Sequence, residues 1–496
     1  MERGELERLI NLCARRGIVI PSFRIYGERA GFYDYGAIGT KIKRRIENEW
    51  RSVFVEGLGN IEIESTLVAP EVVFEASGHL KNFVDPIVTC KSCGSSYRAD
   101  KLLEEHFEKG GDTKSMEGVK RADNETLSKM MDDNSIRCAR CNGELSKISA
   151  FNLMFQTSIG AANRERGYLR PETAQGIFMD FKEVFRTHGL KLPVGIGQVG
   201  RVFRNEISPR NMLIRMREFS QMEMEYFFDP EIDPVIGDMD TSQDLLSVEV
   251  NFLSKEAQGV GIDKVEKVKL SEIYDNKVFP NRLYAYLVSK ELGFLHTLGI
   301  PDESIRLRVL TNEELPHYSK CNIDVEVMIG KNYEEVIGNA YRTDFDLRNH
   351  ERASKKGMDV VNLNKKVVPH VIETSFGTDR LFWAAMYNSL YKDSNREWDV
   401  LLLDERLAPY RYAVFPLQRD EGLISKAVEV RNLLKRGGSD ILYSESGSIG
   451  KRYAKADEIG IPYSITIDYK TLEDGTVTVR DIRDMRQERK RYEEMG

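Results

Sequence analysis

The 496-residue sequence lacks the features that mark membrane and secreted proteins. No apolar run approaches the roughly 20 residues that a membrane span requires. The first residues, MERGELERLINLCARRG, are charged from the start and lack the apolar core of a secretory signal. Internal repeats and low-complexity tracts are absent as well. We therefore expect a cytoplasmic protein with no membrane association.

Cysteine is scarce, because six residues in a chain of this length are too few for a disulfide scaffold. Four of them form two pairs, Cys90-x-x-Cys93 and Cys138-x-x-Cys141. This pattern favours a metal, and the long interval between the pairs is compatible with a zinc ribbon that carries an inserted loop. Four thiolates would leave no open position, so the zinc would be structural. The alternative is four reduced cysteines in a loose insertion.

An excess of positive charge is also missing. The formal net charge of −7 argues against a protein coated by nucleic acid, although it permits a local basic face. Hydrophobic residues make up 41% and charged residues 30%, a balance typical of globular proteins. The length allows two or three domains around a large core.

Hydrophobic spacing predicts several elements. Ile38, Ile42, Ile46 and Trp50 recur at nearly helical intervals and predict an amphipathic helix over 38–53. After Pro409, strand-like and helix-like runs alternate, which predicts a separate α/β domain. Its last basic segment, RDIRDMRQERKRY (480–492), is typical of a solvated helix face that supports contacts with RNA phosphates.

One glycine pattern is misleading. Gly195-Ile-Gly197-Gln-Val-Gly200 fits the G-x-G-x-x-G fingerprint of dinucleotide-binding folds. That fingerprint must open a helix, whereas the following VGRVFRNEISPR favours a strand that runs into a turn at Pro209. We therefore reject a dinucleotide site here.

The strand interpretation predicts a site. Alternation places Arg204 and Glu206 on one face, and in a second strand it places Phe219, Gln221 and Glu223 together. An antiparallel pair of these strands would gather a phosphate binder, carboxylates and an aromatic ring that stacks on a base. The alternative is a solvated sheet face of paired charges.

A third cluster is VIETSFGTDR (371–380). Glu373 and Ser375 share a strand face, Gly377 permits a turn, and an apolar helix follows. A helix N-terminus attracts phosphate. Arg380 in the first helical turn is unfavourable for the helix dipole, which would be explained if it binds a phosphate. The alternative is a plain surface arginine.

These segments resemble class II aminoacyl-tRNA synthetases. Phe203-Arg204-Asn205-Glu206 with Arg217-Glu218-Phe219 is similar to motif 2 of that class, Gly377-Thr378-Asp379-Arg380 to motif 3, and 31–53 to motif 1. YLRPETAQGIF (168–178), FRNEISPR (203–210), VIETSFG (371–377) and SGSIGKRYAKADEIGIP (446–462) resemble the glycyl-tRNA synthetase family of the archaeal and eukaryotic homodimeric type.

The resemblance implies an α+β fold, with the class II antiparallel sheet flanked by helices, insertions, and a C-terminal α/β anticodon-binding domain. We expect the catalytic domain, with motifs 1 to 3, in residues 1–85 and 149–405. We expect an insertion with the two cysteine pairs in 86–148, a probable second insertion in 231–320, and the anticodon-binding domain in 406–496.

The implied reaction is ATP-dependent activation of glycine to glycyl-adenylate, followed by transfer of glycine to the 3′ end of tRNA(Gly). The implied substrates are glycine, ATP with Mg²⁺ and tRNA(Gly), and the implied assembly is a homodimer. Two alternatives stay open. One is a class II synthetase for threonine, serine or proline, and the other is a synthetase-like binding protein that has lost catalysis.

The resemblance also assigns roles to single residues. Arg204, Glu206 and Arg380 are the implied catalytic residues, and Glu335 is the implied Mg²⁺ ligand. The implied ATP site consists of Arg204, Asn205, Glu206, Ile214, Arg215, Met216, Arg217, Glu218, Phe219, Glu335, Val336, Gly377, Thr378, Asp379 and Arg380. The implied glycine site consists of Arg98, Glu172, Phe219, Gln221, Glu223, Arg342, Glu373, Ser375 and Gly377. We also expect Ser375 to fill the space that a larger amino acid would need.

Three positions depart from the family pattern. Thr374 stands where many relatives have proline, Thr378 where an apolar residue is usual, and Tyr341 where a smaller or acidic residue is usual. None of the three removes a charge that the chemistry requires.

Overall fold

The computed structural model describes residues 2–110, 115, 118–119, 122–161, 165–209, 211–239, 246–259 and 265–495. Arg210, the last residue of the FRNEISPR segment, lies outside them. No helix in the described part of the chain is long and apolar enough to span a bilayer.

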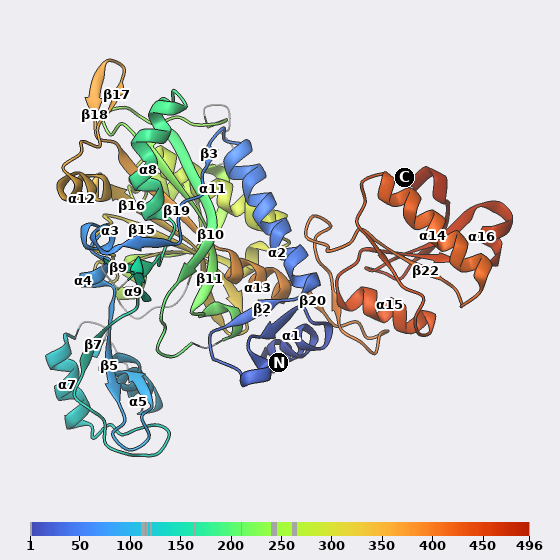
Figure 1. The fold of residues 1–496 in the computed structure, drawn as a ribbon, viewed down its shortest axis with the longest axis horizontal. Coiled ribbons are helices and arrows are strands. Elements are labelled where there is room, and N and C mark those ends of the chain that lie inside the picture. Colours follow the sequence, from blue (N-terminus) through green and yellow to red (C-terminus); the bar gives the residue numbers. More distant parts are fainter. Residues whose placement is uncertain are drawn as a thin grey trace.

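A nine-stranded, mainly antiparallel sheet forms the centre of the molecule (Figure 1). Its order is β13 (Glu266–Lys269), β12 (Glu249–Leu253), β14 (Ile305–Val309), β15 (Asn322–Ile329), β16 (Asn332–Thr343), β19 (His370–Gly377), β11 (Glu218–Phe228), β10 (Val194–Phe203) and β3 (Ile61–Glu62).

The two faces of β11 have different surroundings. Met222, Met224 and Tyr226 point into the largest apolar core, while the residues between them, Glu223 and Glu225, face the other way. Strand β19 shows the same alternation with Ile372 and Phe376 in the core. The polar residues of both strands therefore share the opposite face of the sheet.

Helices cover both faces of the sheet. Core side chains of α1, α2, α11 and α13 join the apolar face, and those of α8 and α12 pack with β10 on the other. The predicted helix over 38–53 is confirmed, since α2 continues into a π-helical turn that ends at Glu56. The bounds are α1 Glu2–Arg16, α2 Ala37–Trp50, α8 Ala174–Thr187, α11 Arg282–Thr297, α12 Phe345–Ser354 and α13 Thr378–Asn388.

The glycine-rich segment that fits the dinucleotide fingerprint is a strand, as predicted, and this strand β10 pairs antiparallel with β11. It ends at Phe203, so Arg204 and Glu206 lie after the strand and not on its face as expected. A Cβ at Gly200 would lie 2.1 Å from Arg170 Nη2, and one at Gly197 would lie 2.9 Å from the Trp50 ring. Glycine is therefore required at these positions by close packing and not by a bound dinucleotide.

Residues 231–320 build one edge of the central sheet. They supply β12, β13 and β14, together with α9 (Lys255–Gly259), α10 (Leu270–Asp275) and the buried helix α11. Residues 240–245 and 260–264 of this segment lie outside the described part.

The cysteine-containing insertion projects from the body at the lower left of Figure 1. It consists of β5 (Val84–Thr89), β6 (Ser96–Arg98), α5 (Ala99–Gly110), α7 (Asn124–Asp133) and β7 (Ser149–Asn152), the strands pairing in the order β6-β5-β7. The remaining small elements of the body are β1 Val19–Pro21, β2 Tyr33–Tyr35, β4 Val68–Pro70, α3 Glu71–Ala76, α4 His79–Asn82, β8 Gln156–Ile159, β9 Glu165–Leu169, β17 Val360–Asn362, β18 Lys365–Val367, β20 Leu390–Tyr391 and β21 Val400–Leu401.

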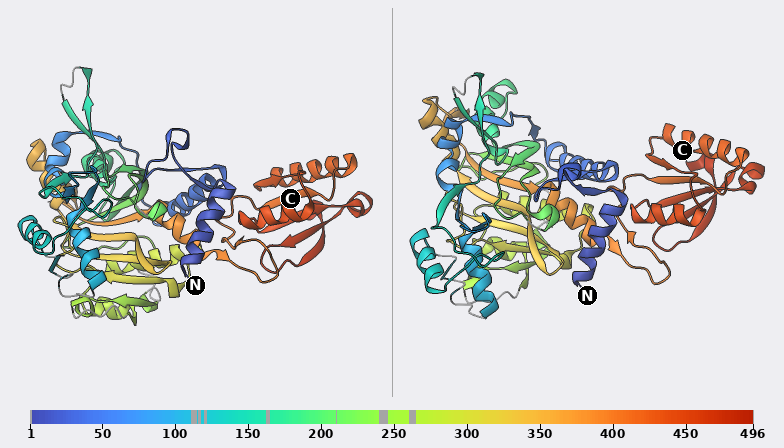
Figure 2. Two further views of the ribbon diagram at one scale, coloured as in Figure 1. Left: turned by 90° about the horizontal axis from the view of Figure 1, so that it is seen from below. Right: turned by 60° about the horizontal axis from the view of Figure 1, so that its bottom comes forward.

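The C-terminal unit stands apart from the body in each view (Figures 1 and 2). Its sheet has the order β23-β22-β24-β25-β26, with the first three strands parallel, and the predicted alternation of strands and helices is confirmed. The bounds are β22 Tyr412–Pro416, α14 Glu421–Arg436, β23 Ile441–Tyr443, α15 Ile449–Glu458, β24 Tyr463–Ile467, α16 Tyr469–Asp474, β25 Thr476–Asp481 and β26 Gln487–Arg491.

The helix predicted over 480–492 is wrong. These residues complete a β-hairpin in which β25 pairs antiparallel with β26. Val477 and Val479 in β25 are buried in the core of the C-terminal unit. The density of arginine suggested a helix, but pairing with β25 satisfies the backbone and leaves most of the basic side chains at the edge of the sheet.

Helix α1 is joined to the C-terminal unit by ion pairs. Arg15 lies 2.6 Å from Glu458 in α15, and Arg16 contacts the same carboxylate. The neighbouring Asp457 is fully buried and accepts hydrogen bonds from Arg480 at 2.8 and 2.9 Å. The junction thus includes two arginines of α1 that pair with one carboxylate of α15, and α15 is held within its own unit by Asp457.

Candidate active site

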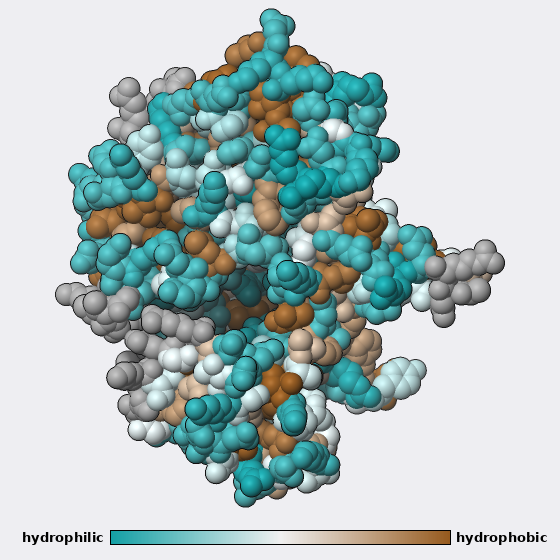
Figure 3. All heavy atoms as spheres, turned by 90° about the vertical axis from the view of Figure 1, so that its left-hand side faces the viewer, coloured by the Kyte–Doolittle hydropathy of each residue, from teal (hydrophilic) through white to brown (hydrophobic). Residues whose placement is uncertain are grey.

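The polar face of β11, β16 and β19 opens into a cleft of about 290 Å³. Figure 3 shows a hollow on this side of the molecule, between the upper body and the lower lobe that the insertion forms. Arg204 and Arg380, from segments far apart in the sequence, both line the cleft. The other lining residues are Glu172, Glu206, Leu213, Ile214, Arg215, Met216, Phe219, Ser220, Gln221, Glu223, Leu310, Pro316, Tyr318, Asn322, Asp324, Glu335, Val336, Gly338, Ala340, Glu373, Ser375, Gly377 and Asp379.

Arg204 follows directly after β10 and is held from two sides. Its Nε donates to the Pro171 carbonyl at 3.1 Å, and its guanidinium lies 5.3 Å from the centroid of the Phe219 ring. Glu206 is paired with Arg215 at 3.1 Å. A guanidinium, an aromatic face and a carboxylate beside a cation are thus close together, a set suited to a nucleotide.

Arg380 stands in the first turn of α13. Its Nη1 donates to the carbonyl oxygen of Glu335 at 2.8 Å and to the Glu335 carboxylate at 3.1 Å. The neighbouring Asp379 fixes the start of this helix, because its Oδ2 accepts from the Ser220 amide at 2.5 Å and its Oδ1 from Lys43 at 3.1 Å. The start of α13, and with it Arg380, is therefore anchored to β11 through Ser220 and to α2 through Lys43.

Two carboxylates converge beside Gly338. A Cβ at Gly338 would lie 3.2 Å from Glu335 Oε1 and 3.9 Å from Asp324 Oδ1. Burial, followed by the charges of Glu335 and Glu326, raises the pKa of Asp324 well above its ordinary value. Oxygen donors that repel one another in this way suit a hard divalent cation.

The opposite end of the cleft is acidic. Glu223 accepts from the amides of Thr173 and Ala174 at 2.6 and 2.9 Å, and from the Ser375 hydroxyl at 2.8 Å. Glu172 and Glu373 complete the acidic end, and all three residues are buried. A small cation is the ligand that such a group of acids would bind.

One buried guanidinium lies behind these acids. Arg342 does not line the cleft but donates to Glu373 at 2.8 Å and to Asp346 at 2.8 Å, and it lies 3.6 Å from Glu172. The Tyr318 ring covers it, with the centroid 3.8 Å away. Arg342 thus orients Glu172 and Glu373 from the side of these acids that faces away from the cleft.

The protonation states of these acids differ. Burial opposes ionisation of Glu172, but the charges of His79 and Arg342 hold the pKa of this carboxyl well below its ordinary value. Burial raises the pKa of Glu373 to about 8, in spite of Arg342. Burial and the charge of Glu373 also raise the pKa of Glu225 well above its ordinary value. The acidic end therefore holds protons near neutral pH.

Several residues assigned by the resemblance lie outside the lining. Arg98, in the insertion, is paired with Asp85 at 3.0 Å and Asp100 at 2.6 Å. Arg217 donates to the Glu206 carbonyl at 3.0 Å, so it stabilises the loop between β10 and β11 and does not line the cleft. Asn205, Glu218, Thr378 and Arg342 are likewise absent from the lining of the cleft.

Other lining residues have no counterpart among the sequence-based assignments. Asp324 could have been found, because in NIDVEVMI it alternates with Asn322 and Glu326 on the polar face of a strand whose other face is apolar. Tyr318, Leu310 and Pro316 lie in a segment without a recognisable motif. Their approach to the cleft follows from the fold alone.

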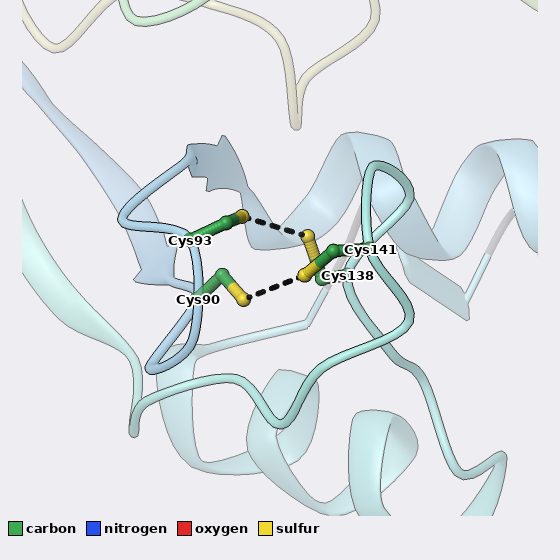
Figure 4. Close-up of side chains that lie close together, drawn as sticks. All are labelled: Cys90, Cys93, Cys138 and Cys141. Carbon is green, nitrogen blue, oxygen red and sulfur yellow. Dashed lines mark hydrogen bonds between the residues drawn. The ribbon is translucent and has the colours of Figure 1, made fainter.

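The four paired cysteines come together in the insertion (Figure 4). All four sulfur atoms lie within 4.8 Å of one another, and the two shortest distances are 3.5 Å for Cys90–Cys141 and 3.6 Å for Cys93–Cys138. A tetrahedral ion bonded to sulfur at about 2.3 Å requires sulfur atoms about 3.8 Å apart. The cluster could therefore hold a metal ion.

Comparison with known proteins agrees with this arrangement. Residues 155–389 match the family described as tRNA synthetase class II core domain (G, H, P, S and T), and residues 412–496 match the anticodon binding domain. The chain is 37% identical to a glycine--tRNA ligase of Methanothrix thermoacetophila, over 97% of this chain and 94% of that protein. It is 36% identical to one of Pyrococcus furiosus, over 98% and 97%.

Among solved structures, the chain is similar to Giardia lamblia prolyl-tRNA synthetase in complex with prolyl-adenylate. The TM-score is 0.58 at 14% identity, and the match covers 100% of this chain and 75% of that one. At this identity the likeness concerns the fold only.

Proposed function

This chain belongs to the glycine--tRNA ligases with a class II core, and from that premise we propose that its cleft joins glycine to ATP and passes the glycyl group to tRNA(Gly). The observation that carries this proposal is that Arg204 and Arg380 line one cleft whose far end is acidic. Two guanidiniums suit a triphosphate, and carboxylates suit the ammonium of a small amino acid.

In the first step, a carboxylate oxygen of glycine attacks the α-phosphorus of ATP and pyrophosphate leaves. The nucleophile is already ionised, so no general base is needed. Arg204 neutralises the α-phosphate, Arg380 holds the γ-phosphate end, and Phe219 stacks on the adenine. Catalysis then rests on orientation and on positive charge at the phosphorus.

In the second step, the terminal ribose of the tRNA displaces AMP from the adenylate. Residues 406–496 would hold the anticodon, and the matched anticodon binding domain at 412–496 supports this role. We propose the remaining limits as 1–85 with 149–405 for catalysis, 86–148 for the insertion and 231–320 for a segment that extends the catalytic sheet. The insertion's small sheet crosses these limits, because β5 begins at Val84 and β7 ends at Asn152.

Selection of glycine would rest on Glu172, Glu223 and Glu373 for the ammonium, and on Ser375 for size. The Ser375 hydroxyl bridges Gln221, at 3.2 Å, and Glu223, at 2.8 Å. A side chain on the substrate would have to displace these bonded groups. Alanine is therefore excluded by occupied space.

Mg²⁺ would be held by Glu335 and Asp324, whose oxygens converge beside Gly338. Bound there, the ion would supply positive charge to the triphosphate. Gly338 leaves the space between the two carboxylates free of a side chain, which supports this assignment.

The protein would act as a cytoplasmic homodimer. Phe23, Ile25 and Tyr26, before the motif 1 segment, are 50%, 87% and 80% exposed, and a second copy would cover them. Sedimentation equilibrium that finds only monomer at micromolar concentration contradicts this assembly.

The proposed function is tested by amino-acid-dependent exchange of labelled pyrophosphate into ATP. Glycine is expected to support exchange, and threonine, serine and proline are not. Exchange with one of these three instead would indicate a synthetase of another specificity. Binding of tRNA without any exchange would indicate a protein that has lost catalysis.

The cysteine cluster leads to a prediction about zinc. Protein purified without chelators is expected to contain about one zinc ion per chain, and Cys90→Ser with Cys138→Ser to contain none. The insertion should then lose its protection from proteases, because the ion contributes to its folding. Elemental analysis and limited proteolysis measure both. Cys13→Ser, which changes a cysteine outside the cluster, is the matched control, and zinc-free wild-type protein would refute the assignment.

The acidic end predicts that glycine binding releases a proton. In the free protein the raised pKa of Glu373, about 8, leaves this carboxyl protonated at neutral pH. The ammonium of bound glycine favours the ionised form and lowers this pKa, so affinity rises with pH by up to about tenfold per unit and levels off above pH 8.

Calorimetry in buffers of different ionisation enthalpy counts the released protons. We expect nearly one proton at pH 7 for the wild type and nearly none for Glu373→Gln. Binding that is independent of both buffer and pH would contradict the protonation state described for Glu373.

A further inference from the structure

Beyond Arg380, the cleft opens into a basic recess. This recess has a volume of about 730 Å³ and shares Ile214, Arg215 and Arg380 with the cleft. Three more cations, Lys101, Arg306 and Lys331, line it. The two hollows thus adjoin each other, and the residues between them include the guanidiniums of Arg215 and Arg380.

The charge of the recess is strongly one-sided. Among its described lining residues, five are cationic and one, Glu334, is acidic. Two of these cations contact carboxylates that lie outside the lining, Arg306 with Glu326 at 2.5 Å and Lys101 with Glu104 at 2.5 Å. The recess therefore presents donors, and it suits a small polyanion.

The walls come from separate parts of the chain. Arg306 is 8% exposed and lies over the Tyr333 ring at 3.9 Å, so its guanidinium is fixed in place. Lys331 is in the turn between β15 and β16, and Lys101 is in α5 of the insertion. The insertion thus contributes a lysine to a hollow that begins at the catalytic cleft.

We propose that this recess is a transit site for pyrophosphate, which receives the leaving group as it moves away from Arg380. The proposal rests on the proposed function. When the bond from the α-phosphorus to its bridging oxygen breaks, the electron pair stays on pyrophosphate. The glycine pocket closes the other end of the cleft, so pyrophosphate must depart on the side of Arg380. The recess begins there.

The test measures exchange of labelled pyrophosphate into ATP with Lys101→Met, Lys331→Met and the double variant. Both lysines are at the rim, so folding is expected to be preserved. The KM for pyrophosphate is expected to rise about fivefold for each variant and about twentyfold for the double variant, with the effect shrinking at high salt. Product inhibition by pyrophosphate should weaken to the same extent, while the KM values for ATP and glycine change less than twofold. Lys356→Met, an exposed lysine outside the recess, is the matched control.

Three outcomes would overturn the proposal. An equal rise in the KM for ATP would make the recess part of the ATP site, and a rise only in the KM for tRNA would assign it to tRNA phosphates. Unchanged KM values for pyrophosphate overturn it as well. An absence of glycine-dependent exchange in the wild type is a different result, because it rejects the proposed function itself.

Discussion

Arg204→Ala is expected to lower the rate of glycine-dependent exchange by about 10²–10³-fold. Charge builds up at the α-phosphorus in the transition state, and Arg204 is the guanidinium that the motif 2 resemblance assigns to it. The alanine variant leaves the Phe219 ring and the acidic end of the cleft in place. We therefore expect the loss mainly in kcat, with the KM for glycine changed by less than about threefold.

The matched control is Arg201→Ala. Arg201 lies in β10, three residues before Arg204, and its contact with Glu218 is a surface pair at 3.5 Å with side chains 44% and 39% exposed. We expect nearly wild-type exchange from it. If Arg204→Ala keeps more than about a tenth of the wild-type kcat, the assignment of Arg204 to the transition state is wrong. Thermal denaturation checks that both variants fold.

Glu172→Gln is expected to raise the KM for glycine by about 10- to 100-fold, the effect of one charge-assisted hydrogen bond in a buried site. Glu172 is the acid whose pKa is held low, so it carries a full charge where the ammonium would bind. Glutamine keeps the shape and can still contact Gln175. Arg342 retains Asp346 and Glu373, so the support below the pocket persists.

The KM for ATP distinguishes this effect from a general loss of structure. It should stay within about twofold, because the triphosphate end is at the other side of the cleft. Glu75→Gln, an exposed acid on α3, serves as the control and should leave both constants unchanged. Equal increases in both constants would show that Glu172 stabilises the fold and does not select glycine.

Elements with a regular hydrophobic period could be predicted from the sequence. The pairing of two strands before Arg204 and after Arg217, the helix from Ile38 to Trp50 and the alternation after Pro409 could be predicted, because the spacing of apolar residues reflects which face is buried. The expected placement of Arg204 and Glu206 on the first strand was wrong, since β10 ends at Phe203. The segment 480–492 misled the prediction, since charged residues lack such a period and the β-hairpin there depends on pairing with β25.

For the site, the sequence predicted those residues that belong to recognisable motifs, such as Arg204, Phe219 and Arg380. The position of Arg342 behind the acids could not be inferred, because it depends on how α12, β16 and β19 pack. The approach of Asp324 to Glu335 requires the register between β15 and β16, including the bulge after Val325. The basic recess needs the docking of the insertion, which no local pattern encodes.

The clasp between Arg15 and Glu458 joins residues 443 positions apart. During synthesis, α1 is among the first segments to leave the ribosome, yet its partner carboxylate is made only when the chain is nearly finished. At roughly 5–20 residues per second, this delay amounts to tens of seconds. Arg15 of the first helix therefore stays without this carboxylate partner for most of synthesis. The contact between α1 and the C-terminal unit forms only when translation is nearly complete.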